Sequence, residues 1–284
     1  MRIAVVGHVE HVTIARVPAL PSPGDILHLP DGPHGDGPLW IAGGGGGITF
    51  AQLARSPADL HLFTAFGNDD AAAAVRARAD ATGATVHAAH RGEPQTRDIV
   101  LLTPGGERTI LVVGRPLHAT LDDPLAWDIL PTCRAVFFTA QDPRVIERAR
   151  AAEILVVTAR RRQALARSGV VADVVVGSAS DPREASTRED YAVPPQALVM
   201  TEGARGGRIE TTRGVVRFAA PPAPPATGGA YGAGDSFAGA LTWYLACGLP
   251  VEEACVRAAP HGAAVLRGID PLEHQVALNP SPPE

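Results

Sequence analysis

Lysine is absent from this sequence, and all 25 basic residues among its 284 are arginine. Three kinds of site depend on a lysine amine: the Walker-type phosphate loop, the Schiff base of pyridoxal enzymes and a lysine general base. All three are therefore excluded. If the protein binds a nucleotide, groups other than lysine must hold its phosphates.

Cysteine is scarce, and Cys133, Cys247 and Cys255 lack the paired spacing of a metal site, so we expect small buried residues without thiol chemistry. An excess of basic charge is missing as well. The net charge of -5 disfavours nucleic acid and membrane surfaces as partners. No apolar run approaches the length of a membrane span or a signal-peptide core, which predicts a cytoplasmic protein.

The chain does contain ample apolar material, with 45% hydrophobic and 19% charged residues. Short apolar runs alternate with helical patterns, which is typical of strands buried on both faces of a parallel sheet. These runs are residues 3–6, 61–66, 135–139, 154–158, 172–176 and 197–201. Residues 71–82 and 144–152 suit covering helices. The sequence predicts a single α/β domain over residues 1–284, a three-layer α/β/α sandwich with a mostly parallel central sheet.

Two stretches depart from this alternation and predict a small β-sheet flap. The first, about residues 17–41, is rich in Pro, Gly, Asp and His without helical periodicity. In the second, β-type runs at 97–103 and 107–113 flank the turn sequence Pro104-Gly105-Gly106. We expect the flap to comprise about residues 8–42 and 95–115. Its open strand edges favour a homodimer contact.

The strongest local signal is Gly232-Ala233-Gly234-Asp235, followed by an apolar helical stretch. Three small residues that permit tight turns lead directly into a helix, so unpaired N–H groups and the helix dipole converge on one point. Such a point favours binding of an anion, with Asp235 beside it. The alternative for Asp235 is simple N-capping of the helix.

The same segment resembles the C-terminal signature of ribokinase-like (pfkB-type) carbohydrate kinases, in which a Gly-Ala-Gly-Asp turn opens a long helix. Four further segments resemble motifs of that family in the right order, so the resemblance spans nearly the whole chain. They are Gly43 to Gly47 with Leu53-Ala54-Arg55, Gly67-Asn68-Asp69-Asp70, Gly106-Glu107-Arg108-Thr109, and Thr201 to Gly207. The resemblance implies a ribokinase-like fold and an ATP-dependent sugar kinase.

By that resemblance, the amides of Gly232, Ala233 and Gly234 form an anion hole for the phosphoryl group, and Asp235 takes the proton from an alcohol. Phosphoryl transfer needs positioning, charge neutralisation and a carboxylate within reach of the attacking hydroxyl. The roles that the resemblance implies therefore agree with the anion site and carboxylate expected from the residues themselves. The resemblance also implies nucleotide contacts, at Thr201, Gly203, Gly206, Ala259 and His261. The alternatives are ordinary turn residues after a strand and, for His261, packing within a helix.

Magnesium is the cofactor expected beside ATP, because a hard, hydrated cation suits phosphate and carboxylate oxygens. The family usually has Asn-x-x-Glu after a strand, and the corresponding stretch is Ser178-Ala179-Ser180-Asp181, which makes Asp181 the candidate ligand. An Asp before Pro182 is also an ordinary turn residue. Gly229-Ala230-Tyr231 replaces the family's Asp-Thr-x, so we expect weak or absent potassium activation.

The acceptor pocket departs furthest from the family pattern, because Glu10, Val12 and Ile48 replace three polar side chains that grip sugar hydroxyls. Each hydroxyl left unpaired would cost about 1–3 kcal/mol, which disfavours a common hexose or ribose in the usual pose. His8 and Glu10 share one side of an extended strand. We expect them to bind an acceptor with an amine or fewer hydroxyls, unless they are exposed strand-end residues. The remaining predicted substrate contacts are Gly43, Gly44 and Arg97, and the alternative for Arg97 is a solvated charge on the flap.

Three functions compete on this evidence. The first is a kinase for a sugar or sugar-like molecule, and the second is a nucleoside kinase with the same machinery. The third is a degenerate relative that binds a ligand without catalysis, although such a protein has no chemical need for the Gly-Ala-Gly-Asp turn. A Rossmann dehydrogenase is disfavoured, because Gly7-His8-Val9 after the first strand lacks the repeated glycines that a pyrophosphate requires.

Overall fold

The computed structural model describes residues 1–29, 37–104, 108–222 and 229–279. Within them the larger of two sheets has nine strands, in the order β13-β12-β11-β10-β9-β8-β1-β4-β5. Neighbouring strands are parallel except in the pairs β11–β12 and β12–β13. The strands are β1 (Arg2–Val6), β4 (Asp59–Phe66), β5 (Thr85–His90), β8 (Ala135–Phe138), β9 (Ile154–Thr158), β10 (Val174–Ser178), β11 (Ala197–Thr201), β12 (Gly207–Thr211) and β13 (Gly214–Phe218). The mostly parallel sheet expected from the apolar runs is confirmed.

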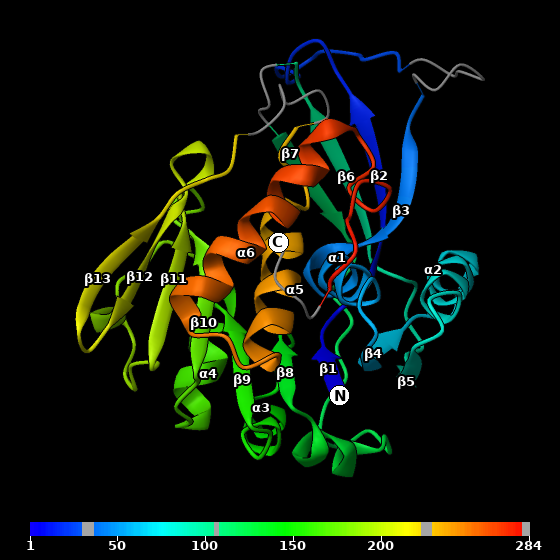
Figure 1. The fold of residues 1–284 in the computed structure, drawn as a ribbon. Helices are drawn as coiled ribbons and strands as arrows, with labels where there is room; N and C mark the ends of the chain where they lie inside the picture. The colour runs from blue at the N-terminus through cyan, green and yellow to red at the C-terminus, as the bar shows by residue number, and fades with distance from the viewer. Residues whose placement is uncertain (30–36, 105–107, 223–228, 280–284) are drawn as a thin grey trace.

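Both faces of this sheet are covered by helices, because alternate side chains of each buried strand enter different cores. In β1, Ile3 and Val5 join one core while Ala4 and Val6 join the other. The helices α1 (Gly44–Leu53), α2 (Asp70–Asp80), α5 (Ala233–Ala246) and α6 (Val251–Ala264) pack into the first core. The second core takes α3 (Pro143–Ala149), α4 (Arg162–Ser168) and the 3-10 turn η1 (Trp127–Thr132). The predicted three-layer sandwich is therefore confirmed (Figure 1).

Shorter 3-10 turns complete the described structure: η2 (Ala159–Arg161), η3 (Arg188–Asp190), η4 (Gly203–Arg205) and η5 (Val265–Arg267). The first and the third of these follow the carboxyl ends of strands β9 and β11. Of the helices that the structure describes, none combines the length and the hydrophobicity that crossing a membrane requires.

The second sheet is the flap, which stands above the main sheet in Figure 1. Its strands are β2 (Glu10–Arg16), β3 (Leu39–Gly43), β6 (Arg97–Leu102) and β7 (Arg108–Val113), in the order β3-β2-β6-β7. The inner face is apolar and forms a core of its own, with Val12, Ile14, Ile41, Val100 and Leu102 among its members. A separate small sheet is thus confirmed. The predicted turn at Gly105-Gly106 and the motif residue Glu107 lie outside the described residues.

Candidate active site

The parallel strands end at one edge of the main sheet, and the flap stands at that edge. Strand β1 ends at Val6 and the chain enters flap strand β2 at Glu10, only a few residues later. The segments that follow β8, β9, β10 and β11 reach the same edge, because these strands run parallel to β1. Open α/β sheets bind ligands at their carboxyl edge. The predicted site residues from His8 to Asp235 are distributed around this edge.

The glycine run at the start of α1 lies between the acceptor side chains and Asp235. A Cβ atom on Gly44 would come within 2.7 Å of the Glu10 Oε2 atom, and a Cβ on Gly45 within 3.3 Å of the Asp235 Oδ1 atom. The Gly45 position is also 3.8 Å from the His8 ring. Gly44 has a φ of +76°, a conformation that disfavours side chains. The glycines therefore leave space next to both carboxyl groups.

Asp235 lies in the first turn of α5, where Gly232 is the N-cap residue. Gly232 has a φ of +81°, and a Cβ there would lie 2.8 Å from Pro271, so the turn requires glycine. Gly234 is exposed, with no atom within 4 Å of its Cβ position. The Thr49 hydroxyl of α1 donates a hydrogen bond to the Asp235 carbonyl oxygen at 3.1 Å. The middle of α1 is thus joined to the first turn of α5 at the site.

The surroundings of Asp235 shift its acidity. Burial of the carboxyl, followed by the charge of Glu184, raises its pKa to about 7, while Arg160 and Arg108 act in the opposite direction. Burial disfavours the ionised form, and a second carboxylate nearby repels it. Perturbed carboxyl groups of this kind gather at functional sites. Asp235 is therefore suited to proton exchange near neutral pH.

Glu10 and Asp98 form a buried carboxyl pair between flap strands β2 and β6. Each residue is 5% exposed, and their side chains share a hydrogen bond. Burial is the largest cause that raises the pKa of each, and for Glu10 the charge of Asp98 is the next cause. Tyr231 lies near both, and its hydroxyl accepts a hydrogen bond from the Gly44 N–H. The pair therefore holds a proton at neutral pH.

Two neutral histidines border the same space. The His8 and His118 rings lie edge to face with centroids 5.1 Å apart, and burial is the main cause that lowers the pKa of His8 to about 3 and that of His118 to about 2. Arg161 is close enough to perturb the pKa values of both rings and of Glu10. Its Nε atom donates to the Thr139 carbonyl oxygen at 2.7 Å. Arg161 is thus a nearby cation that affects both rings and the Glu10 carboxyl.

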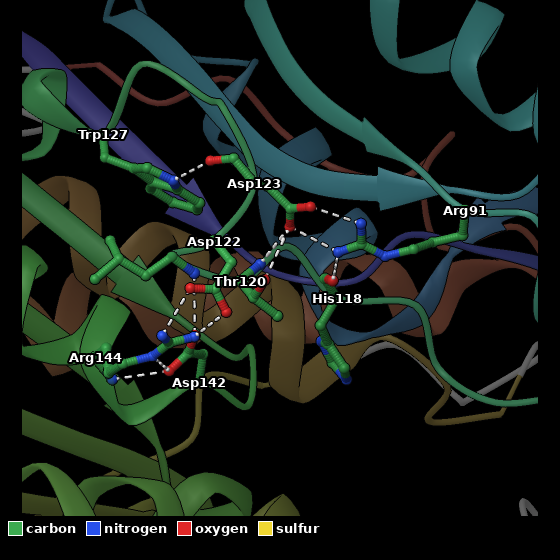
Figure 2. Close-up of polar contacts among 9 residues, drawn as sticks. Arg91, His118, Thr120, Asp122, Asp123, Trp127, Asp142 and Arg144 are labelled. Carbon is green, nitrogen blue, oxygen red and sulfur yellow. Dashed lines mark hydrogen bonds and ion pairs between the residues drawn. The ribbon is translucent and has the colours of Figure 1, made fainter.

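An ion-pair network holds the segment that carries His118 (Figure 2). Arg91 donates to both carboxylate oxygens of Asp123, at 2.6 and 2.7 Å, and to the His118 carbonyl oxygen at 2.7 Å. The Trp127 indole donates to the Asp123 carbonyl oxygen at 2.9 Å. Figure 2 shows the His118 ring pointing away from Arg91, and it also shows a second group of Arg144, Asp122 and Asp142. Bidentate pairing of this kind fixes the backbone from which the ring extends.

Asp181, the predicted metal ligand, belongs to a second cluster near Asp235. Arg160 donates to Asp181 Oδ2 at 2.5 Å and to Glu184 Oε1 at 3.0 Å, and Glu184 Oε2 accepts from the Ser178 N–H at 2.9 Å. The spacing of Asn-x-x-Glu is reproduced by Asp181-Pro182-Arg183-Glu184, which begins at the last residue of the stretch expected from the sequence. Both carboxylates, with their Arg160 partner, therefore stand at the end of β10.

The predicted nucleotide residues after β11 take different positions. The Thr201 hydroxyl donates to the Gly177 carbonyl oxygen at 3.3 Å, and Thr201 is aligned with Ser178 across β10 and β11. Gly203 has a φ of +61° and open space around it. Gly206 differs, because a Cβ atom there would lie 2.0 Å from the Phe218 carbonyl oxygen. The glycine at 206 is therefore required by the β12–β13 hairpin.

Ala259 and His261 lie in α6, which continues through Pro260 to Ala264. His261 is 4% exposed and its Nε2 atom is 3.2 Å from the Tyr244 hydroxyl. Burial is the main cause that lowers the pKa of this histidine to about 4. His261 could stack on a nucleobase only if its ring left this packing. Ala259, the other predicted nucleotide contact in α6, is partly exposed.

Arg97, predicted to contact substrate, is engaged elsewhere. Its Nη2 atom donates to Asp69 Oδ2 at 2.6 Å, and Asp69 also caps α2 and accepts from the Gln95 N–H. Successive strand residues point to opposite faces, so Asp98 is the residue on the inner face of the flap. Arg97 thus anchors the base of the flap to α2 in this structure.

Ile48 and Val12 are fully buried and join the apolar core of the flap together with Tyr231. Gly43 packs against them, since a Cβ there would lie 2.6 Å from Val12 and 3.3 Å from the Tyr231 hydroxyl oxygen. The two aliphatic replacements expected from the sequence therefore form one apolar wall, next to the Glu10 carboxyl.

Several side chains at this edge were not found from the sequence. Asp98 offered one local signal, a carboxyl within an otherwise apolar strand, where charged residues are rare unless paired. Glu184 offered another, its three-residue spacing from Asp181. His118 and Tyr231 carry no such signal, because non-local packing alone brings His118 to His8 and Tyr231 to Glu10.

Comparison with known proteins identifies the relatives of this fold. The family model of pfkB family carbohydrate kinases matches residues 3–271. Ribokinase from Thermotoga maritima superposes with a TM-score of 0.77 at 16% identity, covering 98% of this chain and 96% of that one. No curated protein sequence matches the chain.

Two further solved structures share the fold. Adenosine kinase from Sinorhizobium meliloti has a TM-score of 0.75 at 19% identity, with 95% of each chain covered. Ribokinase from Arabidopsis thaliana, solved with ribose and ATP, has a TM-score of 0.73 at 16% identity and covers 97% of this chain and 96% of that one. With a family model that matches nearly its whole length, the chain belongs to the pfkB family of carbohydrate kinases.

Proposed function

We propose that the protein transfers the γ-phosphate of ATP to a hydroxyl group of a sugar or sugar-like small molecule. The observation that carries this proposal is Asp235, which lies in the first turn of α5 beside the glycine run, with a pKa raised to about 7. A carboxyl of this pKa is largely ionised at slightly alkaline pH and is basic enough to accept a proton from an attacking alcohol.

In the proposed step, the acceptor oxygen forms a bond to the γ-phosphorus while the bond from that phosphorus to the bridging oxygen breaks, and ADP leaves. The proton of the acceptor hydroxyl goes to Asp235. The amides of Gly232, Ala233 and Gly234 would stabilise the charge on the phosphoryl group, as helix N-termini do for anions. The open space around Gly234 supports this role.

Magnesium, when bound, would neutralise charge on the phosphate oxygens. Asp181 and Glu184 fit such an ion, because both present hard carboxylate oxygens at the carboxyl edge of the sheet. Arg160 bridges these carboxylates and adds a fixed positive charge near Asp235. The chain has no lysine, so Arg160 and Arg108 would provide the side-chain charge on this side of the site.

ATP would lie along the ends of β10 and β11, with its phosphates toward Gly203 and its base toward Ala259. Support comes from the open backbone at Gly203 and from the related ribokinase fold solved with ribose and ATP. Closure of the flap over the acceptor would exclude water, so that transfer outcompetes hydrolysis of ATP. The cytoplasm, where ATP is available, is the compartment that suits this reaction.

A nucleoside kinase with the same machinery is the second candidate. The fold is shared with an adenosine kinase from Sinorhizobium meliloti and a nucleoside kinase from Methanocaldococcus jannaschii. In either case the phosphate chemistry at Asp235 is the same, and the difference lies in the acceptor.

The flap also suits a homodimer. Ile99 and Leu111 are aligned neighbours on β6 and β7, and they are 37% and 49% exposed on the face opposite to Asp98. Val113, on the same face, is 53% exposed. An apolar outer face on a small sheet with an open edge favours pairing with a second copy.

The test is ADP formation from ATP and Mg²⁺ across a panel of sugars, deoxy and amino sugars, polyols and nucleosides. We expect acceptor-dependent turnover in the wild type and in Asp80→Asn, an exposed change at the end of α2. Stimulation by nucleosides alone would favour the second candidate. If no acceptor stimulates turnover while ATP still binds, the proposed transfer is wrong and the protein is a ligand-binding relative.

A further inference from the structure

We propose that the acceptor of this kinase carries a primary ammonium group, which binds to the carboxyl pair of Glu10 and Asp98 and takes the place of the proton that they share. This inference rests on the proposed function, since it names the class of acceptor for the same site. Amino sugars and amino alcohols, which offer both an ammonium group and a hydroxyl for phosphorylation, are the chemical class that it predicts.

The first argument is the geometry of the carboxyl pair. Two side chains from flap strands far apart in the sequence are brought into hydrogen-bond contact in a place where each is 5% exposed. Glu10 contacts the site directly, because its Oε2 atom lies 2.7 Å from the Cβ position of Gly44, whose neighbour Gly45 lies against Asp235. A group bound by the pair therefore lies next to the proposed catalytic base.

The second argument is an unused acceptor atom. Asp98 Oδ1 is buried, and among the described residues no N–H or hydroxyl group donates to it, which leaves the proton shared with Glu10 as the donor to this side chain. A buried carboxylate oxygen without a donor is costly, so native structures rarely leave one unless a ligand or water completes it. An ammonium group brings three donors and no acceptor, which matches carboxyl oxygens on two sides.

The third argument is charge balance around the pair. Arg161 is the cation that perturbs Glu10, from the turn after β9, while Asp235 faces Glu10 from α5 as a further carboxyl. His8, 3.9 Å from Glu10, is neutral at pH 7 because its pKa is lowered by burial, and Tyr231 is neutral as well. The Glu10–Asp98 pair against the one guanidinium of Arg161 leaves a negative charge unmatched, and Asp235 adds to it. Without an acceptor, a proton on the carboxyl pair balances this charge. A bound ammonium group would take the place of that proton.

A neutral polyol fits the same walls less well. Ile48 and Val12 are fully buried beside the pair and offer nothing to a hydroxyl. Each unpaired hydroxyl costs about 1–3 kcal/mol, whereas an ammonium group donates its hydrogen bonds to the carboxyl pair and needs no polar partner from these two side chains.

The test compares amines with their hydroxyl counterparts in binding to the full chain, measured by calorimetry at pH 7. The pairs are D-glucosamine with D-glucose, D-galactosamine with D-galactose, serinol with glycerol, and ethanolamine with ethylene glycol. We expect at least one amine to bind about tenfold more tightly than its counterpart. Buffers of different ionisation enthalpy should show release of about one proton, as Glu10 ionises on binding.

Two isosteric variants assign the effect. Glu10→Gln and Asp98→Asn should each remove most of the preference for the amine, and Glu10→Gln should also remove the proton release. Glu253→Gln, the same chemical change at an exposed position on α6, should keep both. If one of the two variants fails to fold, the other variant and the wild-type comparison still decide the question.

The inference is overturned if no amine binds more tightly than its hydroxyl counterpart, or if the preference survives in both variants. The kinase proposal fails in a different way. Asp235-dependent phosphorylation of a neutral polyol would leave the kinase standing and remove the ammonium group. An amine that binds with the predicted preference but is never phosphorylated would support the ammonium site and contradict the kinase proposal.

Discussion

Asp235 has an unusual pKa because burial of its carboxyl and the charges of its neighbours act on it together. Burial and the charge of Glu184 raise its pKa, and Arg160 lowers it. The sequence identified Asp235 through its Gly-Ala-Gly-Asp turn, since that signal is local. It did not identify Glu184 or Arg160 as neighbours, because these follow other strands and meet Asp235 only when the sheet is assembled.

The pH dependence of kcat/KM tests this arrangement. The base must be ionised, so activity should rise with pH and level off above about pH 7. Glu184→Gln removes a repelling charge and should move the rise to lower pH, whereas Arg160→Gln removes an attracting charge and should move it to higher pH. Shifts in the same direction in both variants, or no shift in either, would contradict the assignment.

The glycine at position 44 allows a second test at the residue scale. Gly44 and Gly83 have nearly the same φ, +76° and +79°, but only the Gly44 position meets another group, at 2.7 Å from Glu10. Both Gly44→Ala and Gly83→Ala should lose about 1–2 kcal/mol of unfolding free energy from backbone strain. Gly44→Ala should in addition lower kcat/KM for the acceptor at least tenfold. Matching activities in the two variants would show that Gly44 has no role in the site.

At the scale of elements, the strands of the main sheet were predictable and the composition of the site was not. Apolar runs such as 135–139 and 197–201 are strong local signals, because a strand buried on both faces has few alternatives. By contrast, β2 and β6 pair across more than 80 positions of sequence, and this pairing places Asp98 beside Glu10. No local pattern specifies such a register, so the sequence points to Arg97 at the start of the flap strand and gives no reason to pair Asp98 with Glu10.

The segment after β7 delivers His118 to the acceptor pocket, and Arg91 fixes it. Arg91→Met should lower the unfolding free energy by about 1–3 kcal/mol, because Asp123 is only 12% exposed and loses its bidentate partner. We also expect a higher KM for the acceptor with an unchanged KM for ATP. Arg257→Met, which breaks an exposed pair within α6, should cost about 0.5 kcal/mol or less and leave both KM values unchanged. A raised KM for ATP alone would contradict this role for the segment.

At the scale of the whole molecule, the outer face of the flap predicts a dimer. Leu111→Arg places a charge on an apolar face where Leu111 is 49% exposed, and it should convert the dimer to a monomer in light scattering. Val215→Arg is the matched control, because Val215 is 61% exposed on the edge strand of the main sheet, away from the flap. Monomeric wild-type protein, or dissociation in Val215→Arg alone, would contradict the predicted contact.

The central claim is that this chain is a kinase whose base is Asp235, and formation of phosphorylated acceptor tests it most directly. The measurement follows product by mass spectrometry, with ATP, Mg²⁺ and the best acceptor, for the wild type and Asp235→Asn, while calorimetry follows ATP binding. We predict product in the wild type, a loss of about 10²–10⁴-fold in rate in the variant, and nearly unchanged ATP affinity. Undiminished product formation in Asp235→Asn would contradict the account.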